Sequence, residues 1–390
     1  MACIFFFSIP AHGHVNPTLP LVRELTARGH RVIYYETEEF REKIEAAGAA
    51  FVSVESYMPP APENIDQVAG KDFAALIDMV AKTTLNLDAR IAQDIAREKP
   101  DLIIGDSICF WGKLLAKKYG VPFVCSTTSF AFNQYSSRRM KPRLPELLRM
   151  ITGMPRIEKS MQLLRDHGYS VSSFVDVIQN DADTDTIVYT SRLFQPESES
   201  FGNNYAFVGP SVAARYARKE HDRPLVYISL GTVLHDAPHF YRQCLSALSA
   251  MDCDAVISIG NKVVPASLGV IPENVRIYPR VNQLEVLASA DVFLTHCGMN
   301  SVSESLLCGV PMLLFPQHSE QEAVASRAKE LGAGLRLRRA TATQIRKALE
   351  TVLADTQYKE AAQAIADNFA KCGGAKEAAD FIETRIFPVT

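Results

Sequence analysis

Short apolar runs alternate with helix-compatible segments along this chain, and the alternation occurs twice. The apolar runs of the first half are residues 3–8, 31–35, 51–54, 101–105 and 121–125. After residue 224 the pattern restarts, with the runs VYISL, AVISI, VRIYP, DVFLT and PMLLF. Strands that alternate with helices form parallel sheets whose two faces are covered by the helices. The sequence therefore predicts an α/β protein with two doubly wound, Rossmann-like sheets.

The length of the chain favours two domains. A chain of 390 residues is longer than a single hydrophobic core usually accommodates. Residues 208–224 contain Gly, Pro and charges of both signs with little periodicity, which is typical of a linker. We predict that residues 1–212 form an N-terminal domain and residues 213–370 a C-terminal domain. Residues 371–390 are expected to form a helix that returns to the N-terminal domain. Two such domains face each other across a cleft, where ligands bind at the carboxyl ends of strands.

Composition restricts the possible partners and compartment. A net charge of -3 offers no electrostatic basis for binding nucleic acid. The eight cysteines are scattered without a CxxC pair, which is typical of a reducing cytosol. The apolar start lacks the basic region of a signal peptide, and no segment reaches the roughly 18 apolar residues of a membrane span. We expect a cytoplasmic protein with no integral membrane association; its oligomeric state is not readable.

Polar side chains follow the first and fourth predicted strands. The segment PAHGHVNP places His14 after the first strand, and GDS places Asp106 after the fourth. These strands are neighbours in a sheet ordered 3-2-1-4-5, so their carboxyl ends meet. A His–Asp pair there would act as a general base and its orienter; the alternative is that each residue caps the following helix. A dinucleotide site is disfavoured because the first turn has only Gly13 instead of G-x-G-x-x-G.

The second half carries a denser motif, THCGMNSVSESLLCGVPMLLFPQHSEQ, from Thr295 to Gln321. It follows an apolar strand and opens a helix, whose free N–H groups form an anion site that His296 extends. Glu304, one turn further, is placed to accept from a ribose hydroxyl. Glu320 and Gln321 offer an acceptor and an amide that suit sugar hydroxyls.

This long motif resembles the nucleotide-sugar signature of the inverting UDP-glycosyltransferases, family 1, which have the GT-B fold. The chain is most similar to bacterial macrolide and flavonoid glycosyltransferases. The resemblance extends over the whole chain, through GHVNP, Asp106 with Trp111, SLGT and VNQLEVL.

The resemblance implies a role for each matching residue. His14 would be the catalytic base and Asp106 its partner. The residues implied to bind the donor are Ser229, Thr232, Arg280, Val281, Gln283, His296, Gly298, Asn300, Ser301, Glu304, Glu320 and Gln321. Many relatives have Trp-x-Pro-Gln where this chain has Arg280, Val281, Asn282 and Gln283, so an arginine plane would replace the ring that stacks on uracil.

The implied reaction is a single in-line displacement. His14 would remove the acceptor proton, and the helix N-terminus with His296 would stabilise the departing diphosphate, so that an α-linked donor gives a β-glycoside. No cofactor is implied beyond the UDP-sugar co-substrate, and no metal. Two DxD sequences, beginning at Asp181 and Asp252, lie in polar turns and are interpreted as solvated carboxylates.

The expected activity is the transfer of a hexose, with glucose favoured by the Glu–Gln pair, to a hydroxyl of a small lipophilic or aromatic acceptor. Ile108, Trp111 and Phe130 are the candidate acceptor contacts; the alternative is that they fill the core beneath long loops. Two other functions remain open: a GT-B-like sugar-nucleotide epimerase, and a non-catalytic glycosyltransferase-like accessory protein.

Overall fold

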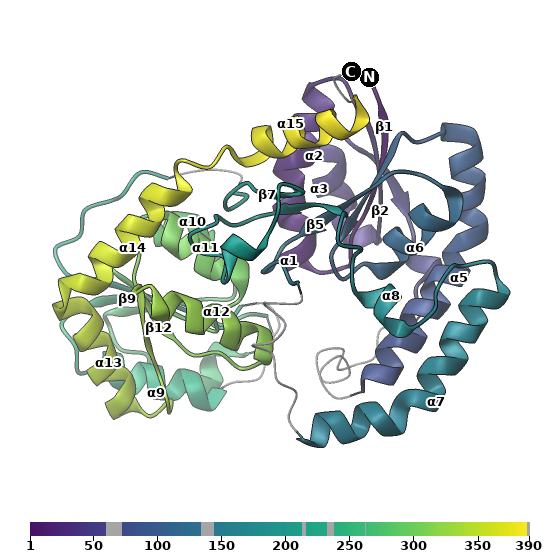
Figure 1. Cartoon of the computed structure of the whole chain (residues 1–390). Helices are drawn as coiled ribbons and strands as arrows, with labels where there is room; N and C mark the ends of the chain where they lie inside the picture. The colour runs from purple at the N-terminus through teal and green to yellow at the C-terminus, as the bar shows by residue number, and fades with distance from the viewer. Residues whose placement is uncertain (60–71, 134–143, 213–215, 232–237, 262, 388–390) are drawn as a thin grey trace. The chain divides into compact units, whose positions relative to one another are not determined.

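The computed structural model describes residues 1–59, 72–133, 144–212, 216–231, 238–261 and 263–387 (Figure 1). The chain forms two compact units, each with its own parallel sheet. Unit 1 comprises Met1–Tyr189, Glu197–Ser211 and Gly373–Thr390, and unit 2 comprises Thr190–Pro196 and Val212–Cys372. The C-terminal segment therefore belongs to the same unit as the N-terminus.

Unit 1 contains a seven-stranded sheet in the order β3-β2-β1-β4-β5-β6-β7, with every pairing parallel. Its strands are β1 (Cys3–Phe7), β2 (Arg31–Glu36), β3 (Ala50–Ser53), β4 (Leu102–Asp106), β5 (Phe123–Thr127), β6 (Asp185–Val188) and β7 (Tyr205–Phe207). The predicted order of the first five strands is confirmed, and two further strands extend the sheet beyond β5. β1 is apolar throughout because helices cover both faces of a parallel sheet.

The helices of unit 1 cover two separate hydrophobic clusters, one on each face of the sheet. They are α1 (His12–Val15), α2 (Leu19–Ala27), α3 (Arg41–Ala46), α5 (Phe73–Glu98), α6 (Phe110–Tyr119), α7 (Leu144–Asp166), α8 (Phe174–Ile178) and α15 (Gly374–Ile386). Residues 5 and 7 of β1 face the cluster under α5, and residues 4 and 6 face the cluster under α2. Figure 1 shows α7 beside α5, and α15 along α2.

The start of the first helical segment differs from the sequence prediction. In the sequence, Asn16 followed by Pro17 predicts an N-cap with proline at the first helical position, but Asn16 is itself helical, with φ -56° and ψ -42°. The helical conformation begins at His12, after an extended Ala11. The Asn16 side chain instead accepts a hydrogen bond from Lys43 at 3.2 Å. His14 is therefore held in a helical turn rather than in an open loop.

Unit 2 contains a six-stranded parallel sheet in the order β10-β9-β8-β11-β12-β13. Its strands are β8 (Leu225–Ser229), β9 (Asp254–Ser258), β10 (Val275–Tyr278), β11 (Val292–Thr295), β12 (Met312–Leu314) and β13 (Gly334–Arg336). Its helices are α9 (Pro238–Leu248), α10 (Gln283–Leu287), α11 (Met299–Leu307), α12 (Ser319–Glu330), α13 (Ala342–Ala354) and α14 (Thr356–Phe369). Both units thus repeat the strand order 3-2-1-4-5, which confirms the predicted α/β class with two doubly wound sheets.

None of the helices formed by the described residues is long and apolar enough to cross a membrane.

Candidate active site

His14 and Asp106 meet at the carboxyl edge of the sheet in unit 1. His14 Nδ1 lies 2.8 Å from Asp106 Oδ2, and the Asp106 side chain is fully buried while that of His14 is 17% exposed. β1 and β4 pair in register through Phe7 and Gly105, so the residues that follow them emerge at the same level. A carboxylate only accepts hydrogen bonds, so Nδ1 carries the donated proton and Nε2 is the acceptor nitrogen of the ring.

Asp106 uses its two oxygens for two tasks. Oδ1 accepts the backbone N–H of Ile108 at 2.9 Å, which fixes the turn after β4, while Oδ2 faces the imidazole. The following helix, α6, has Cys109 at its N-cap and receives no side-chain cap. The helix-cap alternative for Asp106 is therefore not the one that this structure adopts.

Thr128, which sequence analysis did not single out, is a third member of this group. Its hydroxyl lies 2.9 Å from His14 Nδ1 and 3.5 Å from Asp106 Oδ2. Thr128 directly follows β5, the strand beside β4. Because β5 lies beside β4, the strand order that brings His14 and Asp106 together also places Thr128 at this edge of the sheet.

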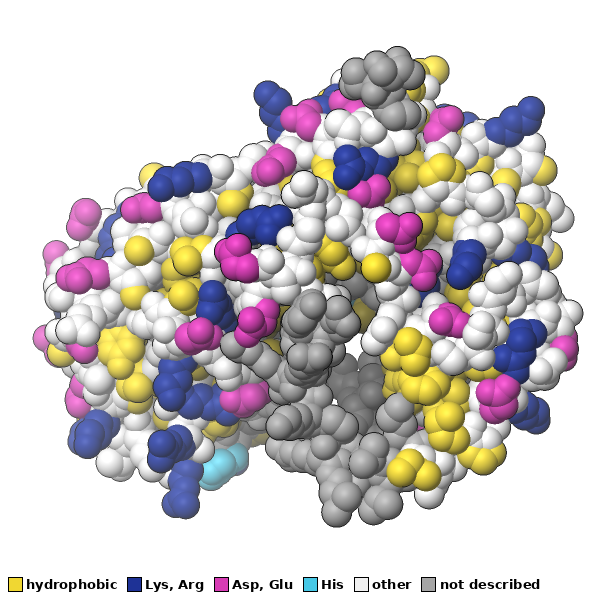
Figure 2. Space-filling view, viewed as in Figure 1, with side chains coloured by type: hydrophobic (Ala, Val, Ile, Leu, Met, Phe, Trp, Pro, Cys, Tyr) yellow, Lys and Arg dark blue, Asp and Glu magenta, His cyan; other side chains and the backbone are white. Residues whose placement is uncertain are grey.

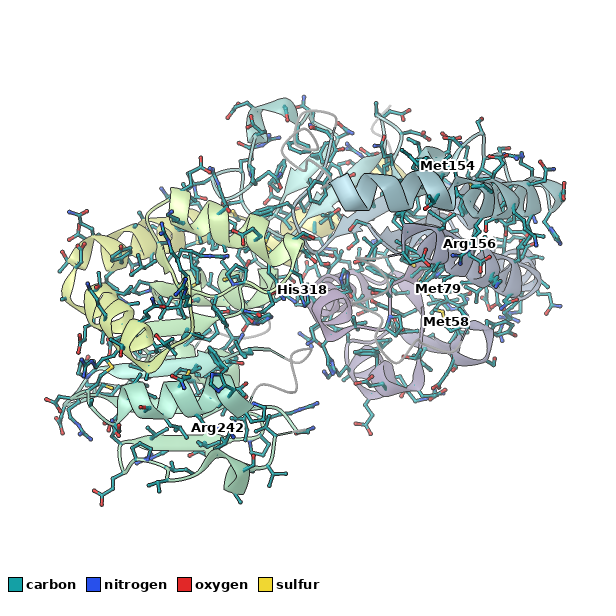
Figure 3. All side chains as sticks on the ribbon, turned by 90° about the horizontal axis from the view of Figure 1, so that it is seen from below. Met58, Met79, Met154, Arg156, Arg242 and His318 are labelled. Atoms are coloured by element: carbon teal, nitrogen blue, oxygen red, sulfur yellow. The ribbon has the colours of Figure 1, made fainter. Side chains whose placement is uncertain are left out.

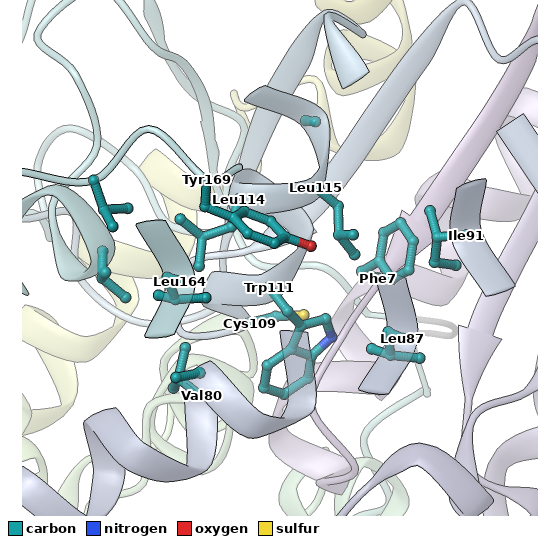
Figure 4. Packing of buried hydrophobic residues seen from close by; sticks show 14 of the residues in the cluster. Phe7, Val80, Leu87, Ile91, Cys109, Trp111, Leu114, Leu115, Leu164 and Tyr169 are labelled. Atoms are coloured by element: carbon teal, nitrogen blue, oxygen red, sulfur yellow. The ribbon is translucent and has the colours of Figure 1, made fainter. Parts of the chain in front are cut away.

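The three candidate acceptor contacts have different surroundings. Trp111 is only 4% exposed and packs in the hydrophobic cluster beside Cys109 and Leu87 (Figure 4), which matches the core-filling alternative. Phe130 is also buried. Ile108, at 44%, is the exposed member of the set.

Unit 1 also presents exposed apolar side chains on its helices. Met154 of α7 and Val175 of α8 are 39% and 38% exposed, and Figure 2 shows hydrophobic side chains gathered over α8 and the adjoining surface. Figure 3 shows Met79 of α5 and Met154 of α7 on these two packed helices. The loops around residues 57–67 and 127–165 are also candidates for acceptor binding, and their residues 60–67 and 134–143 lie outside the described residues.

In unit 2, two turns meet where β8 and β11 end side by side. Ser229 pairs with Thr295 in the register of these strands, so the SLGT turn lies against the turn that carries His296. Ser229 is buried, and its hydroxyl accepts the N–H of Gly231 at 3.2 Å. Thr232, the remaining predicted residue of this turn, lies outside the described residues.

His296 is enclosed by two glycines. A Cβ on Gly231 would lie 2.5 Å from Cε1 of the ring, and a Cβ on Gly298 would lie 2.7 Å from Nε2. Burial lowers the pKa of His296 to about 4, against an opposing hydrogen bond with the Ser229 backbone, so the ring is neutral at pH 7. Its Nδ1 has no hydrogen-bond partner among the described residues. A buried polar atom in this state is typical of a site that a ligand completes.

Gly298 is the N-cap residue of α11, so the first N–H groups of this helix are available to an anion. Asn300 and Ser301 lie in its first turn and are partly buried. Glu304 follows one turn later, and burial raises its pKa while a hydrogen bond from Gln283 lowers it.

A hydrogen-bonded chain holds Glu304. Gln283 Nε2 donates to Glu304 Oε2 at 2.6 Å and to Ser301 at 3.2 Å. The hydroxyl of Tyr227, a buried residue of β8, donates in turn to Gln283 Oε1 at 3.2 Å. The structure thus brings the predicted residues Gln283, Ser301 and Glu304 together and adds Tyr227, which sequence analysis did not identify.

The remaining predicted donor residues lie in loops or at helix starts. Arg280 is exposed and Val281 is half-buried, just before α10. Glu320 is exposed in the first turn of α12, and Gln321 beside it accepts the N–H of Gln317 through Oε1 at 2.8 Å. Among the described residues, no hydrogen bond or ion pair joins these four side chains to His296 or Glu304.

Neither DxD sequence gathers ligands in the part of the chain that is described. Asp254 forms an ion pair with Arg223, and Asp181 belongs to a turn before β6. Within that part, no group of three or more His, Cys, Asp and Glu side chains is arranged to hold a metal ion.

Solved structures of known proteins share this architecture. The chain is similar to a glycosyltransferase of kitacinnamycin, with a TM-score of 0.86 and 28% identity over 99% of both chains. It is also similar to CalG4, the calicheamicin glycosyltransferase, with a TM-score of 0.82 and 29% identity over 100% of this chain and 99% of the other. Two doubly wound parallel sheets with these neighbours define a glycosyltransferase of the GT-B fold.

Sequence comparison identifies the family. Residues 242–383 match the C-terminal domain described as Erythromycin biosynthesis protein CIII-like. The NDP-glycosyltransferase YjiC of Bacillus licheniformis is 35% identical over 99% of this chain and 98% of its own length. The oleandomycin glycosyltransferase of Streptomyces antibioticus is 32% identical over 99% and 91%. The chain belongs to the family 1 glycosyltransferases of the macrolide, NDP-sugar-dependent type.

Proposed function

We propose that this glycosyltransferase moves a hexose, with glucose favoured, from a UDP-sugar to a hydroxyl of a small lipophilic acceptor, with inversion and without a metal. The observation that carries the proposal is the 2.8 Å contact between His14 Nδ1 and the buried Asp106. It leaves the opposite ring nitrogen as a base, and the carboxylate stabilises the imidazolium that forms.

The donor half of the proposal rests on α11. Its N-terminal N–H groups and the buried His296 would bind the diphosphate, and Glu304 would accept from the ribose hydroxyls. Because His296 is neutral, it would contribute a hydrogen bond rather than a charge. Dipole and hydrogen bonds would then stabilise the leaving group.

The acceptor half rests on exposed apolar surface in unit 1. Ile108 is 44% exposed next to Asp106, and Phe132, soon after Thr128, is 49% exposed. Side chains of this kind favour an aromatic or lipophilic molecule that presents one hydroxyl.

The test is product formation from UDP-glucose and a flavonol in EDTA, comparing wild type with His14→Ala. We expect a β-glucoside from wild type and a loss of at least 10²-fold in kcat for the variant. His167→Ala is the matched control because His167 is exposed on another part of unit 1. Full activity in His14→Ala would refute the proposed base.

Two further outcomes separate the alternative functions. Donor consumption without an acceptor, giving an isomeric nucleotide sugar, would indicate an epimerase. No turnover of UDP- or dTDP-sugars across a broad acceptor panel, with folded protein, would indicate an accessory protein.

A further inference from the structure

Glu36 is a buried carboxyl group beside the His–Asp pair that the proposed reaction does not use. It ends β2 and is fully buried. Oε1 accepts the N–H of Thr37 at 2.9 Å, whereas Oε2 has no hydrogen-bond partner in the described part of the chain. Burying a carboxyl group with one oxygen that accepts no hydrogen bond costs free energy, so the presence of Glu36 here requires a physical explanation.

The sheet register places Glu36 level with Asp106. Tyr35 of β2 and Gly105 of β4 both pair with Phe7 of the strand between them, so Glu36 and Asp106 each stand one residue further. Two strand spacings separate their Cα atoms by about 10 Å. Side chains alternate along a strand, so both residues project to the face of Tyr34, where α1 and α2 pack.

The charges around Glu36 come from the elements that surround it. Burial is the main cause that raises its pKa, to about 8; the Thr37 N–H lowers it, Asp106 raises it and His14 lowers it. Two further titratable groups interact with the carboxyl: Tyr34 on its own strand and Cys109 before α6. Glu36 is therefore neutral at pH 7. Asp106 and His14 shift its pKa in opposite directions.

We propose that Glu36 is a positioning residue for the base, a buried carboxyl whose charge is coupled to that of His14 and so sets how strongly the imidazole holds a proton. A proton on His14 favours ionisation of Glu36, and an ionised Glu36 favours protonated His14, because the two effects are one coupling free energy. The importance of this coupling for turnover rests on the proposed function of His14. The coupling itself requires neither donor nor acceptor.

The experiment is an NMR titration of the His14 imidazole in ¹⁵N-histidine-labelled protein from pH 5 to 10, with the signal assigned by its loss in His14→Ala. In wild type we expect two inflections, the second near pH 8 where Glu36 ionises. In Glu36→Gln we expect the second inflection to be lost. Glu38→Gln, which changes an exposed carboxylate paired with Arg41, should retain it.

Identical His14 curves in wild type and Glu36→Gln would overturn the proposal. A titration of ¹³Cδ-glutamate-labelled wild type in parallel should show a Glu36 carboxyl signal, assigned by sequential connectivity to Thr37, that moves near pH 8. Titration of that signal near the ordinary 4.5 would also overturn it, and this measurement remains decisive if Glu36→Gln does not fold. Because neither titration measures product, an active His14→Ala enzyme would refute the base while leaving the coupling intact.

Discussion

Asp106 and Glu36 lie at equivalent positions at the ends of β4 and β2, but their carboxyl groups have different numbers of hydrogen-bond partners. Asp106 faces three hydrogen-bonding groups, from Ile108, His14 and Thr128, whereas Glu36 receives one, from Thr37. Hydrogen bonds to a carboxylate stabilise its charged form, and burial without them stabilises the neutral form. Burial with a single hydrogen-bond donor therefore accounts for the raised pKa of Glu36.

This difference predicts how stability depends on pH. The folded pKa of Glu36 is about 8 against an ordinary value of 4.5, so the folded state retains a proton that the unfolded state releases. Below pH 4.5 the ionisation of this residue does not reduce the free energy of unfolding. As the pH rises from 4.5 through 8, the free energy of unfolding falls by about 4–5 kcal/mol in total. Glu36→Gln should remove most of that slope.

The measurement is urea unfolding at pH 5, 7 and 9, followed by the fluorescence of Trp111. This residue is the single tryptophan of the chain and is buried in unit 1, so it reports on the unit that contains Glu36. Glu38→Gln is the control, with an exposed carboxylate. Equal pH slopes in wild type and Glu36→Gln would contradict the prediction.

At the scale of elements, the start of α11 depends on small residues around His296. Gly298 has φ -61° and ψ 141°, which alanine adopts without strain, so Gly298→Ala adds only a Cβ at 2.7 Å from His296 Nε2. If His296 binds the diphosphate as proposed, displacement of its ring should weaken UDP binding by roughly 10- to 100-fold. Isothermal titration with UDP measures the change.

The control for this variant is Gly269→Ala in the same unit. Gly269 has φ +86°, and its Cβ would meet nothing within 4 Å. Its ψ of -146° places it in a backbone region that is nearly restricted to glycine, so this substitution should cost about 1–3 kcal/mol of stability without changing UDP affinity. Unchanged affinity in Gly298→Ala would argue against the proposed role of His296.

A second element-scale prediction concerns the contact between β8 and α10. Tyr227→Phe removes the hydroxyl that orients the Gln283 amide and, through it, the Glu304 carboxylate. The loss of one such hydrogen bond, about 1 kcal/mol, should raise the donor KM roughly five-fold and leave kcat nearly unchanged. Tyr241→Phe, another buried tyrosine of unit 2, is the control. A larger effect on kcat than on KM would contradict the positioning role.

The elements that sequence analysis predicted are those with long, unambiguous patterns. The strands flanked by amphipathic helices were recognised, whereas β7 and β13, with three residues each, are too short for any periodicity to appear. The helical turn over His12 does not follow from the sequence, because Asn-Pro is typical of a helix start and the helical conformation begins four residues before Asn16.

The site residues also divide into those that the sequence predicts and those that it does not. His14 and Asp106 could be paired from strand order alone, because adjacent parallel strands bring their carboxyl ends together. Glu36 and Thr128 follow from the same rule, but their burial and hydrogen bonds depend on register and packing that no single-sequence pattern encodes. The Tyr227–Gln283 contact joins residues far apart in the chain and has no local signal.

At the scale of the whole molecule, α15 joins the C-terminal segment to the hydrophobic core of unit 1. Ala378, Ala379 and Ile382 are fully buried in the cluster under α2, and Arg28 donates to Asp380 at 2.6 Å. Ile382→Ala should therefore cost about 2–5 kcal/mol of unit 1 stability.

This prediction is measured by Trp111 fluorescence during urea unfolding. Thr384→Ala, an exposed position two residues further on the same helix, should change stability by less than about 0.5 kcal/mol. Equal stability of the two variants would mean that α15 packs more loosely than the structure indicates.

The position of α15 also has a consequence for biosynthesis. A ribosome that has translated the seven strands of the first sheet must still synthesise residues 212–372 before the helix that covers α2 emerges. At 5–20 residues per second, that interval lasts about 10 to 30 s. Throughout it, the nascent chain presents the uncovered apolar flank of α2, so we expect chaperone demand to persist until Gly374–Ile386 has been synthesised.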